Sequence, residues 1–175
     1  SRTPDLVASD GLEVLAGDAT QPQPLGDAVA GHDAVVITIG GSLSDRDTRH
    51  RATANVVAAM KANGVQRVVA ISSLGAGDSY GRVGFATKAI TKTLLRNAIK
   101  DHNAQEQVLT ASGLDWTILR PAGLTNDDTE VRVIADATSP LKGNGRVGRD
   151  AVAGVVMDAL EGPKWSRAAV AILAP

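Results

Sequence analysis

The sequence contains no cysteine, and its only aromatic residues are two Trp, one Tyr and one Phe among 175 residues. The absence of cysteine excludes disulfides, a thiol nucleophile and a thiolate metal site. So few aromatic rings argue against an all-β core. Instead, the chain has 18 glycines and is 43% hydrophobic. This composition can bury a core, and it suits the close helix-on-sheet packing of an α/β protein.

A large net charge and long hydrophobic runs are also missing. Lys and Arg number 18 against 19 Asp and Glu, so the formal net charge is -1 and no nucleic-acid partner is predicted. The longest apolar runs fall far short of the roughly 20 residues that cross a bilayer. No basic and apolar signal segment opens the sequence. We therefore expect a cytoplasmic protein that acts on a small molecule, without a membrane partner, as a monomer or small homo-oligomer.

Short apolar runs alternate with helical patterns along the whole chain. Strands are predicted at 12–16, 33–39, 66–72, 115–120 and 168–173, with a weaker one at 130–135. Helices are predicted at 45–63, 85–112 and 149–161. Continuous β-branched runs are typical of strands buried on both faces. The alternation predicts one α/β domain over residues 1–175, a Rossmann-like doubly wound parallel sheet.

Residues 125–148 are the least regular part of the chain and are rich in Asn, Asp, Thr and Gly. A binding loop or small subdomain on the substrate side fits this composition, and so does an ordinary surface excursion. The sequence leaves both interpretations open.

Small or polar residues follow each predicted strand of the sheet. An open α/β sheet binds its ligand beyond the carboxyl ends of its strands, where such residues let a ligand approach the backbone. These segments are Gly17-Asp18-Ala19, Gly40-Gly41-Ser42, Ser72-Ser73 and Pro121-Ala122-Gly123-Leu124. They are the candidate binding residues.

A dinucleotide site should also have a glycine-rich turn after its first strand. None precedes residue 11. The cluster over residues 75–81 lacks a properly placed acid, because the next predicted strand ends at Arg120, nearly 40 residues further on, where about 20 are expected. Alternatively, residues 1–4 are the end of a second strand, and the preceding strand, turn and helix are missing from the sequence. In that position Arg2 would accommodate the 2′-phosphate of NADP, although a solvated terminal charge is an equal alternative.

Several motifs together resemble the atypical, NmrA-like branch of the short-chain dehydrogenases/reductases. They are Arg2-Thr-Pro4, Gly17-Asp18, Gly31-His-Asp-Ala-Val35, Gly40-Gly41, Gly64-Val-Gln-Arg-Val-Val-Ala-Ile-Ser-Ser-Leu-Gly75, Ser112-Gly-Leu-Asp-Trp-Thr-Ile-Leu-Arg-Pro121 and Gly148-Arg-Asp-Ala-Val152. Within that branch, residues 55–65 and 100–109 resemble most the biliverdin reductase B group, also called NADPH flavin reductases. The resemblance covers nearly the whole chain.

The resemblance implies a role for each candidate residue. Arg2 would hold the 2′-phosphate of NADP, Asp18 with Ala19 the adenine edge, and Ile39 with Gly40 and Gly41 the ribose side. Ser72 and Ser73 would lie beside the nicotinamide, and Pro121, Ala122, Gly123 and Leu124 would line its other flank. Ser73 and His102 are the catalytic candidates. The simpler interpretations are that the serines cap a strand end and that His102 is an ordinary helix residue.

The Tyr-x-x-x-Lys pair of the larger superfamily is absent, because Gly84 lies four residues after Tyr80. Reduction of a simple ketone needs a proton for its oxyanion, whereas a conjugated acceptor spreads the charge itself. We therefore predict hydride transfer from NADPH to a flavin or tetrapyrrole type of acceptor, with no metal. A non-catalytic, NADP-binding redox sensor is the alternative, since the NmrA-like branch includes such regulators.

Other charged residues are predicted to face solvent. Asp101 and Glu106 are five residues apart and so do not share a helix face. Arg46, Arg49 and Arg51 form a local basic patch on the helix after Gly41.

Overall fold

The computed structural model describes residues 10–23, 25–41, 46–141 and 146–175. Within these ranges, no helix combines the length and the apolar character that crossing a membrane requires. The elements in chain order are α1 (Leu25–Val29), β1 (Ala34–Ile37), α2 (Thr48–Ala62), β2 (Arg67–Ile71), α3 (Ser79–Arg82), α4 (Phe85–Lys92), α5 (Arg96–Thr110), β3 (Asp115–Pro121), β4 (Leu124–Thr125), β5 (Arg132–Ile134), β6 (Val147–Gly148), α6 (Arg149–Leu160) and β7 (Ala168–Leu173).

The main sheet has the strand order β1-β2-β3-β7-β5. β1, β2, β3 and β7 run parallel, so the predicted parallel sheet is confirmed. β5 corresponds to the weaker predicted strand and pairs antiparallel with β7 at the edge. β4 and β6 form a separate two-stranded parallel ladder.

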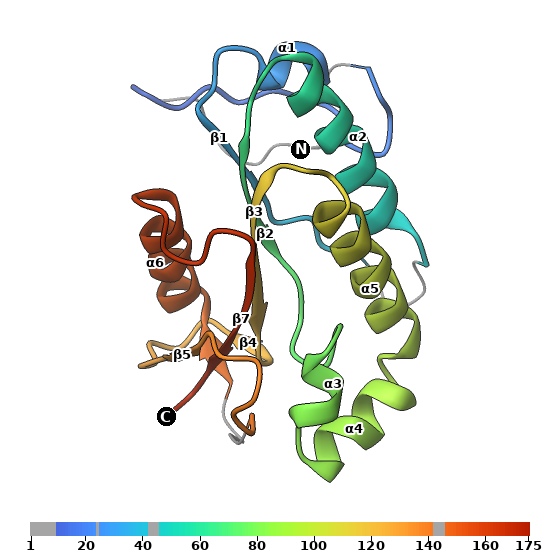
Figure 1. The fold of residues 1–175 in the computed structure, drawn as a ribbon, viewed down its shortest axis with the longest axis vertical. Coiled ribbons are helices and arrows are strands. Elements are labelled where there is room, and N and C mark those ends of the chain that lie inside the picture. The colour runs from blue at the N-terminus through green and yellow to red at the C-terminus, as the bar shows by residue number, and fades with distance from the viewer. Residues whose placement is uncertain (1–9, 24, 42–45, 142–145) are drawn as a thin grey trace.

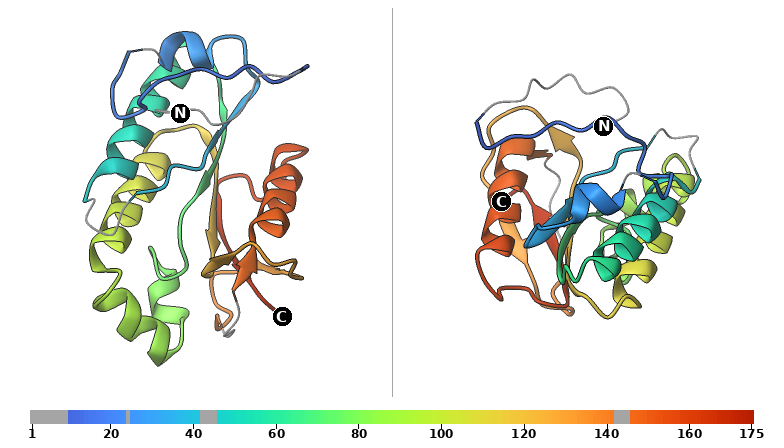
Figure 2. Two further views of the ribbon diagram at one scale, coloured as in Figure 1. Left: turned by 180° about the vertical axis from the view of Figure 1, so that it is seen from behind. Right: turned by 90° about the horizontal axis from the view of Figure 1, so that it is seen from above.

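Helices cover both faces of this sheet, as the doubly wound prediction requires. α2 and α5 lie on one face and α6 on the other (Figures 1 and 2). Successive side chains of a strand point to opposite faces. In β2, Val68 packs in a cluster with Met60 of α2, and the next residue, Val69, packs in a cluster with Val155 of α6. The continuous apolar runs are therefore explained by burial on two sides.

Two predicted elements differ in the structure. Residues 12–16 are described but form no strand, and Leu12 and Leu15 remain 43% and 49% exposed. The long helix predicted at 85–112 is two helices, α4 and α5, because a turn at residues 93–95 interrupts the helix after Lys92. Thr91 and Thr93 donate their hydroxyls to backbone carbonyls of α4 at this break, a contact that competes with regular helix.

Candidate functional site

Two loops leave the same edge of the sheet side by side, one after β2 and one after β3. The backbone N–H of Ser72 donates to the carbonyl of Leu119 at 2.7 Å, and that of Leu74 donates to the carbonyl of Pro121 at 2.9 Å. The parallel hydrogen bonding of the strands thus continues into the loops. This fixes the predicted strand-end residues of both loops next to each other.

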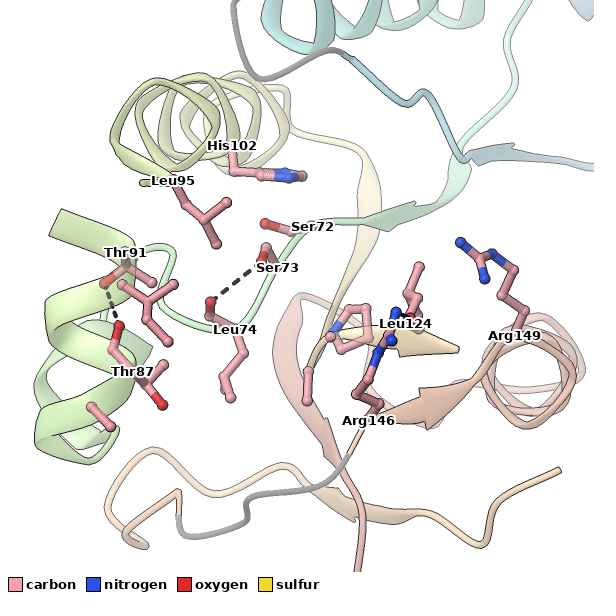
Figure 3. A pocket seen from close by; sticks show the side chains of 15 residues that line it. Ser72, Ser73, Leu74, Thr87, Thr91, Leu95, His102, Leu124, Arg146 and Arg149 are labelled. Atoms are coloured by element: carbon pink, nitrogen blue, oxygen red, sulfur yellow. Dashed lines mark hydrogen bonds between the residues drawn. The ribbon is translucent and has the colours of Figure 1, made fainter. Parts of the chain in front are cut away.

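These loops form the floor of a cavity of about 680 Å³ (Figure 3). α4 and the start of α5 form one wall, and β4, β6 and α6 form the other. The size lies within the range of small-molecule sites. The predicted site residues that line the cavity are Ser72, Ser73, His102, Pro121, Ala122, Gly123 and Leu124. The other lining residues are Leu74, Ala86, Thr87, Ile90, Thr91, Leu95, Arg146 and Arg149.

A buried ion pair lies directly behind the cavity floor. The guanidinium of Arg120 donates from Nε and Nη2 to the two carboxylate oxygens of Glu106, at 2.9 and 2.7 Å. The hydroxyl of Ser72 donates to Oε1 of the same carboxylate at 2.6 Å. The prediction that Glu106 faces solvent is wrong, since the residue is 6% exposed. Arg120 and Ser72 together satisfy both carboxylate oxygens of this buried residue.

Asp78 connects this pair to the protein surface. Arg120 Nη1 donates to Asp78 Oδ1 at 2.6 Å, and Arg82 lies 3.6 Å from Oδ2. Burial acts to raise the pKa of Asp78, but the hydrogen bond and charge of Arg120 outweigh it, so the pKa lies below its ordinary value. Arg120 is thus bracketed by two carboxylates, which together raise the pKa of Arg120 against its desolvation.

Gly75 and Gly77 have packing roles, whereas a Cβ on Gly81 would meet nothing within 4 Å. A Cβ on Gly77 would lie 2.6 Å from Glu106 Oε2 and would also overlap the guanidinium of Arg120. A Cβ on Gly75 would lie 2.8 Å from Thr91 Cγ2. The backbone therefore passes closely over buried side chains here. This accounts for these two glycines without a phosphate-binding loop.

His102 reaches the cavity as a neutral imidazole. Gln105 donates Nε2 to Thr53 Oγ1 at 3.3 Å, so its Oε1 accepts from His102 Nδ1 at 3.2 Å. Burial lowers the pKa of His102 to about 4, and the positive charge of Arg49 acts in the same direction. The ring is therefore neutral at neutral pH. Because Gln105 Oε1 accepts from Nδ1, the proton of the neutral ring is on Nδ1. Nε2 is left as a hydrogen-bond acceptor.

Asp101, the neighbour of His102, is fully buried and holds the start of α2. Its Oδ2 accepts from the backbone N–H of Arg49 and its Oδ1 from that of His50, both at 3.0 Å. Arg49 also forms an ion pair with Asp101 at 3.3 Å, and its side chain is 9% exposed. The predictions that Asp101 and Arg49 face solvent are therefore wrong. Arg46 and Arg51 are exposed as predicted.

The other predicted residues that the structure describes lie outside the cavity, and two of them are hydrogen-bonded to α2. The carbonyl of Ala19 accepts from Asn55 of α2 at 3.1 Å, and that of Gly41 accepts from Arg49 at 3.4 Å. Asp18 bonds within its own turn, to Thr20. Ile39 packs against the core and Gly40 is exposed. Arg2 lies outside the described residues.

Sequence reasoning missed Glu106, Arg120, Arg146 and Arg149. For Glu106 a signal was available: it lies four residues after His102, and residues at that spacing share a helix face. Arg120 ends a strand directly before the candidate segment that begins at Pro121. Arg146 lies in the irregular region 125–148, and Arg149 is the first residue of α6, which follows it. No hydrophobic periodicity there indicates which way these side chains point.

Comparison with known proteins identifies relatives of the same fold. A model of a family described as NAD(P)H-binding matches residues 1–163. An uncharacterized chloroplastic protein of Arabidopsis thaliana is 28% identical over 157 residues, which is 85% of this chain and 55% of that protein. The chain therefore spans little more than half of that relative.

Several solved structures have a similar fold. A Rossmann-fold NAD(P)-binding family protein of Shigella flexneri is 29% identical, with a TM-score of 0.65 over 92% of this chain and 70% of its own. A short-chain dehydrogenase/reductase of Veillonella parvula in complex with NADP is 24% identical, with a TM-score of 0.76 over 92% and 71%. ChuY, an anaerobilin reductase of Escherichia coli O157:H7, is 24% identical, with a TM-score of 0.74 over 91% and 74%.

Proposed function

The chain belongs to the NAD(P)H-binding family, and from this premise we propose that it is an NADPH-dependent reductase of planar conjugated acceptors of the flavin or tetrapyrrole type. The observation that carries the proposal is the cavity at the carboxyl ends of β2 and β3. Among the residues that the structure describes, its lining combines two serines, two threonines, a neutral histidine and two arginines with aliphatic side chains, and it includes no Tyr, Lys, Asp or Glu. Such a lining can orient a conjugated molecule but has no strong acid to protonate an oxyanion.

The residues present fit a nicotinamide cofactor. Ser72 gives its hydroxyl hydrogen to Glu106, so toward the cavity its oxygen can only accept, as a carboxamide N–H requires. Ala122 and Gly123 leave room for a ring beside the loop. NADPH, when bound, supplies the hydride. We assign Arg2 to its 2′-phosphate, and assign Asp18, Ala19, Ile39, Gly40 and Gly41 to its adenosine half. The Gly41 carbonyl accepts from Arg49, which pairs with Asp101, the neighbour of the cavity residue His102, and this contact supports the assignment.

The chain's own residues would hold the acceptor and exclude water. Ser73 donates its hydroxyl to the adjacent Leu74 carbonyl through a long contact of 3.3 Å, and can turn toward an acceptor oxygen. His102 Nε2 can accept from a ring N–H, a group that flavins and linear tetrapyrroles both carry. Leu74, Ile90 and Leu95 line the α4 side of the cavity. Fixed distance and a dry site are the main requirements of hydride transfer.

NADPH oxidation with FMN, FAD or biliverdin tests the proposal. We expect turnover with at least one acceptor, and we expect Ser73→Ala to lower kcat/KM by about tenfold or more. Ser166→Ala, at an exposed serine bonded to Asp115, is the matched control. Tight NADPH binding without turnover of any of these acceptors would contradict the reductase. It would favour the alternative, an NADP-binding redox sensor whose cofactor changes its affinity for another protein.

A further inference from the structure

Two arginines on the α6 side of the cavity, Arg146 and Arg149, form hydrogen bonds to uncharged groups. Arg146 donates Nη2 to the carbonyl of Leu124, and Arg149 donates Nη1 to Asn126 Oδ1 at 2.6 Å. Both acceptors are uncharged. Within the described ranges, neither guanidinium forms an ion pair with a carboxylate. Two positive charges therefore face a common space.

The fold positions these arginines, although both are exposed. The two residues of β6 separate them, and β6 pairs with β4 through Leu124 with Val147 and Thr125 with Gly148. Val147 is fully buried in the core. The short ladder therefore fixes the backbone on either side of it. Both guanidiniums then contact residues 124–126, one at the Leu124 carbonyl and the other at the Asn126 side chain.

The rest of the cavity does not compensate these charges. Its lining, as far as the structure describes the chain, includes no Asp or Glu, and the pKa of His102, lowered to about 4 by burial, keeps that ring neutral. The chain as a whole has a net charge of -1, so this is a local concentration of positive charge. The opposite wall, from α4 and the start of α5, includes Ile90 and Leu95 (Figure 3). The cavity is thus cationic on one side, whereas the α4 side is mainly aliphatic and includes Thr87 and Thr91.

We infer that the acceptor carries an anionic oxyacid group, a carboxylate or a phosphate, which Arg146 and Arg149 bind while its apolar body lies against the α4 side. This inference rests on the proposed function, because it concerns the acceptor of that same cavity. A guanidinium binds carboxylate or phosphate through two parallel hydrogen bonds. A neutral acceptor of the same shape would leave both charges without a partner.

Equilibrium binding of matched ligand pairs tests the inference. FMN and riboflavin differ by a phosphate, and biliverdin and its dimethyl ester differ by the charge of two carboxylates. Dissociation constants are measured by flavin fluorescence and bilin absorbance, with NADP⁺ present, for the wild type, Arg146→Gln and Arg149→Gln. Arg51→Gln is the control, since that exposed residue of α2 pairs with Asp47 at 3.9 Å, outside the cavity lining.

The wild type should bind the acidic member of at least one pair about tenfold or more tightly than the neutral member. Each cavity variant should reduce that ratio by several-fold, and Arg51→Gln should preserve it. The pair that shows the effect distinguishes phosphate from carboxylate.

Equal binding of both members by the wild type, no binding of any ligand, or a ratio unchanged in both cavity variants would overturn the inference. So would a parallel loss of NADPH affinity, because the arginines would then serve the cofactor's phosphates. NADPH oxidation judges the proposed function separately. Turnover that does not distinguish acidic from neutral acceptors would refute only the inference, whereas acid-selective binding without turnover would refute only the reductase.

Discussion

Ser72 donates its hydroxyl hydrogen to Glu106 at 2.6 Å, which joins the floor of the cavity to the buried ion pair behind it. Glu106 in turn accepts two hydrogen bonds from Arg120. One carboxylate therefore determines both the orientation of Ser72 and the charge balance beneath the strand ends. The stability of the domain and the geometry of the cavity depend on the same residue.

Glu106→Gln should lower the free energy of unfolding by about 3 kcal/mol, because it leaves Arg120 facing a neutral amide in a buried position. Urea denaturation at pH 7 measures the change. The control Glu161→Gln, at the exposed end of α6, should stay within about 0.5 kcal/mol of the wild type. Equal stability of the two variants would contradict the role assigned to the pair.

Gly77→Ala should be more destabilising than Gly64→Ala, although both glycines have positive φ, +55° and +73°. Both substitutions place an alanine in the left-handed region, which costs about 1 kcal/mol. Only the Cβ at residue 77 meets other atoms, those of Glu106 and Arg120, whereas nothing lies within 4 Å at residue 64. Thermal and urea unfolding of both variants compare the two costs. Similar losses would show that the buried pair moves aside freely.

His102 should make stability depend on pH between about 4 and its unfolded value of 6.5. Because the folded pKa is the lower one, the unfolded chain binds more protons in this window. The contribution of His102 to the free energy of unfolding is therefore fully present above pH 6.5. It is lost as the pH decreases toward 4, by on the order of 3 kcal/mol.

The variant His102→Gln isolates this contribution. Its unfolding free energy, measured from pH 4 to pH 7.5, should change less with pH than that of the wild type. His32→Gln is the control, at an exposed histidine bonded to the Ala30 carbonyl, and it should keep the wild-type slope. Identical slopes for all three proteins would mean that His102 titrates normally in the folded state.

Arg2→Glu should weaken NADPH binding far more than NADH binding. The substitution places a carboxylate where we assign the 2′-phosphate, which NADH lacks. Titration of cofactor fluorescence gives both dissociation constants, and Arg51→Glu on the exposed face of α2 controls for the change in net charge. An equal effect on NADPH and NADH would remove Arg2 from the cofactor site.

The local sequence was sufficient to predict the sheet. The runs that became β2, β3 and β7 carry apolar residues on both alternating sides, which suits burial between two helical layers. β1 has the same pattern, although its Val36 is 38% exposed. The same reasoning placed four strand-end segments at one edge, because the carboxyl ends of parallel strands lie together, and the cavity lining includes two of the four. Ser72, Ser73 and Pro121–Leu124 could therefore be identified as neighbours without a structure. Residues 12–16 show the limit, since an apolar run is not a strand where it gains no burial.

The sequence could not reveal which polar residues of α5 are buried. Asp101 and Glu106 are five residues apart, about 140° around a helix, which indicated different faces and suggested exposure. Both faces are in fact covered, one by the start of α2 and the other by Arg120 at the end of β3. Their partners lie 52 and 14 residues away in the chain. Local periodicity thus determined the strands and their loops, whereas the packing of α5 against distant elements decided which charges became buried, because burial depends on both surfaces.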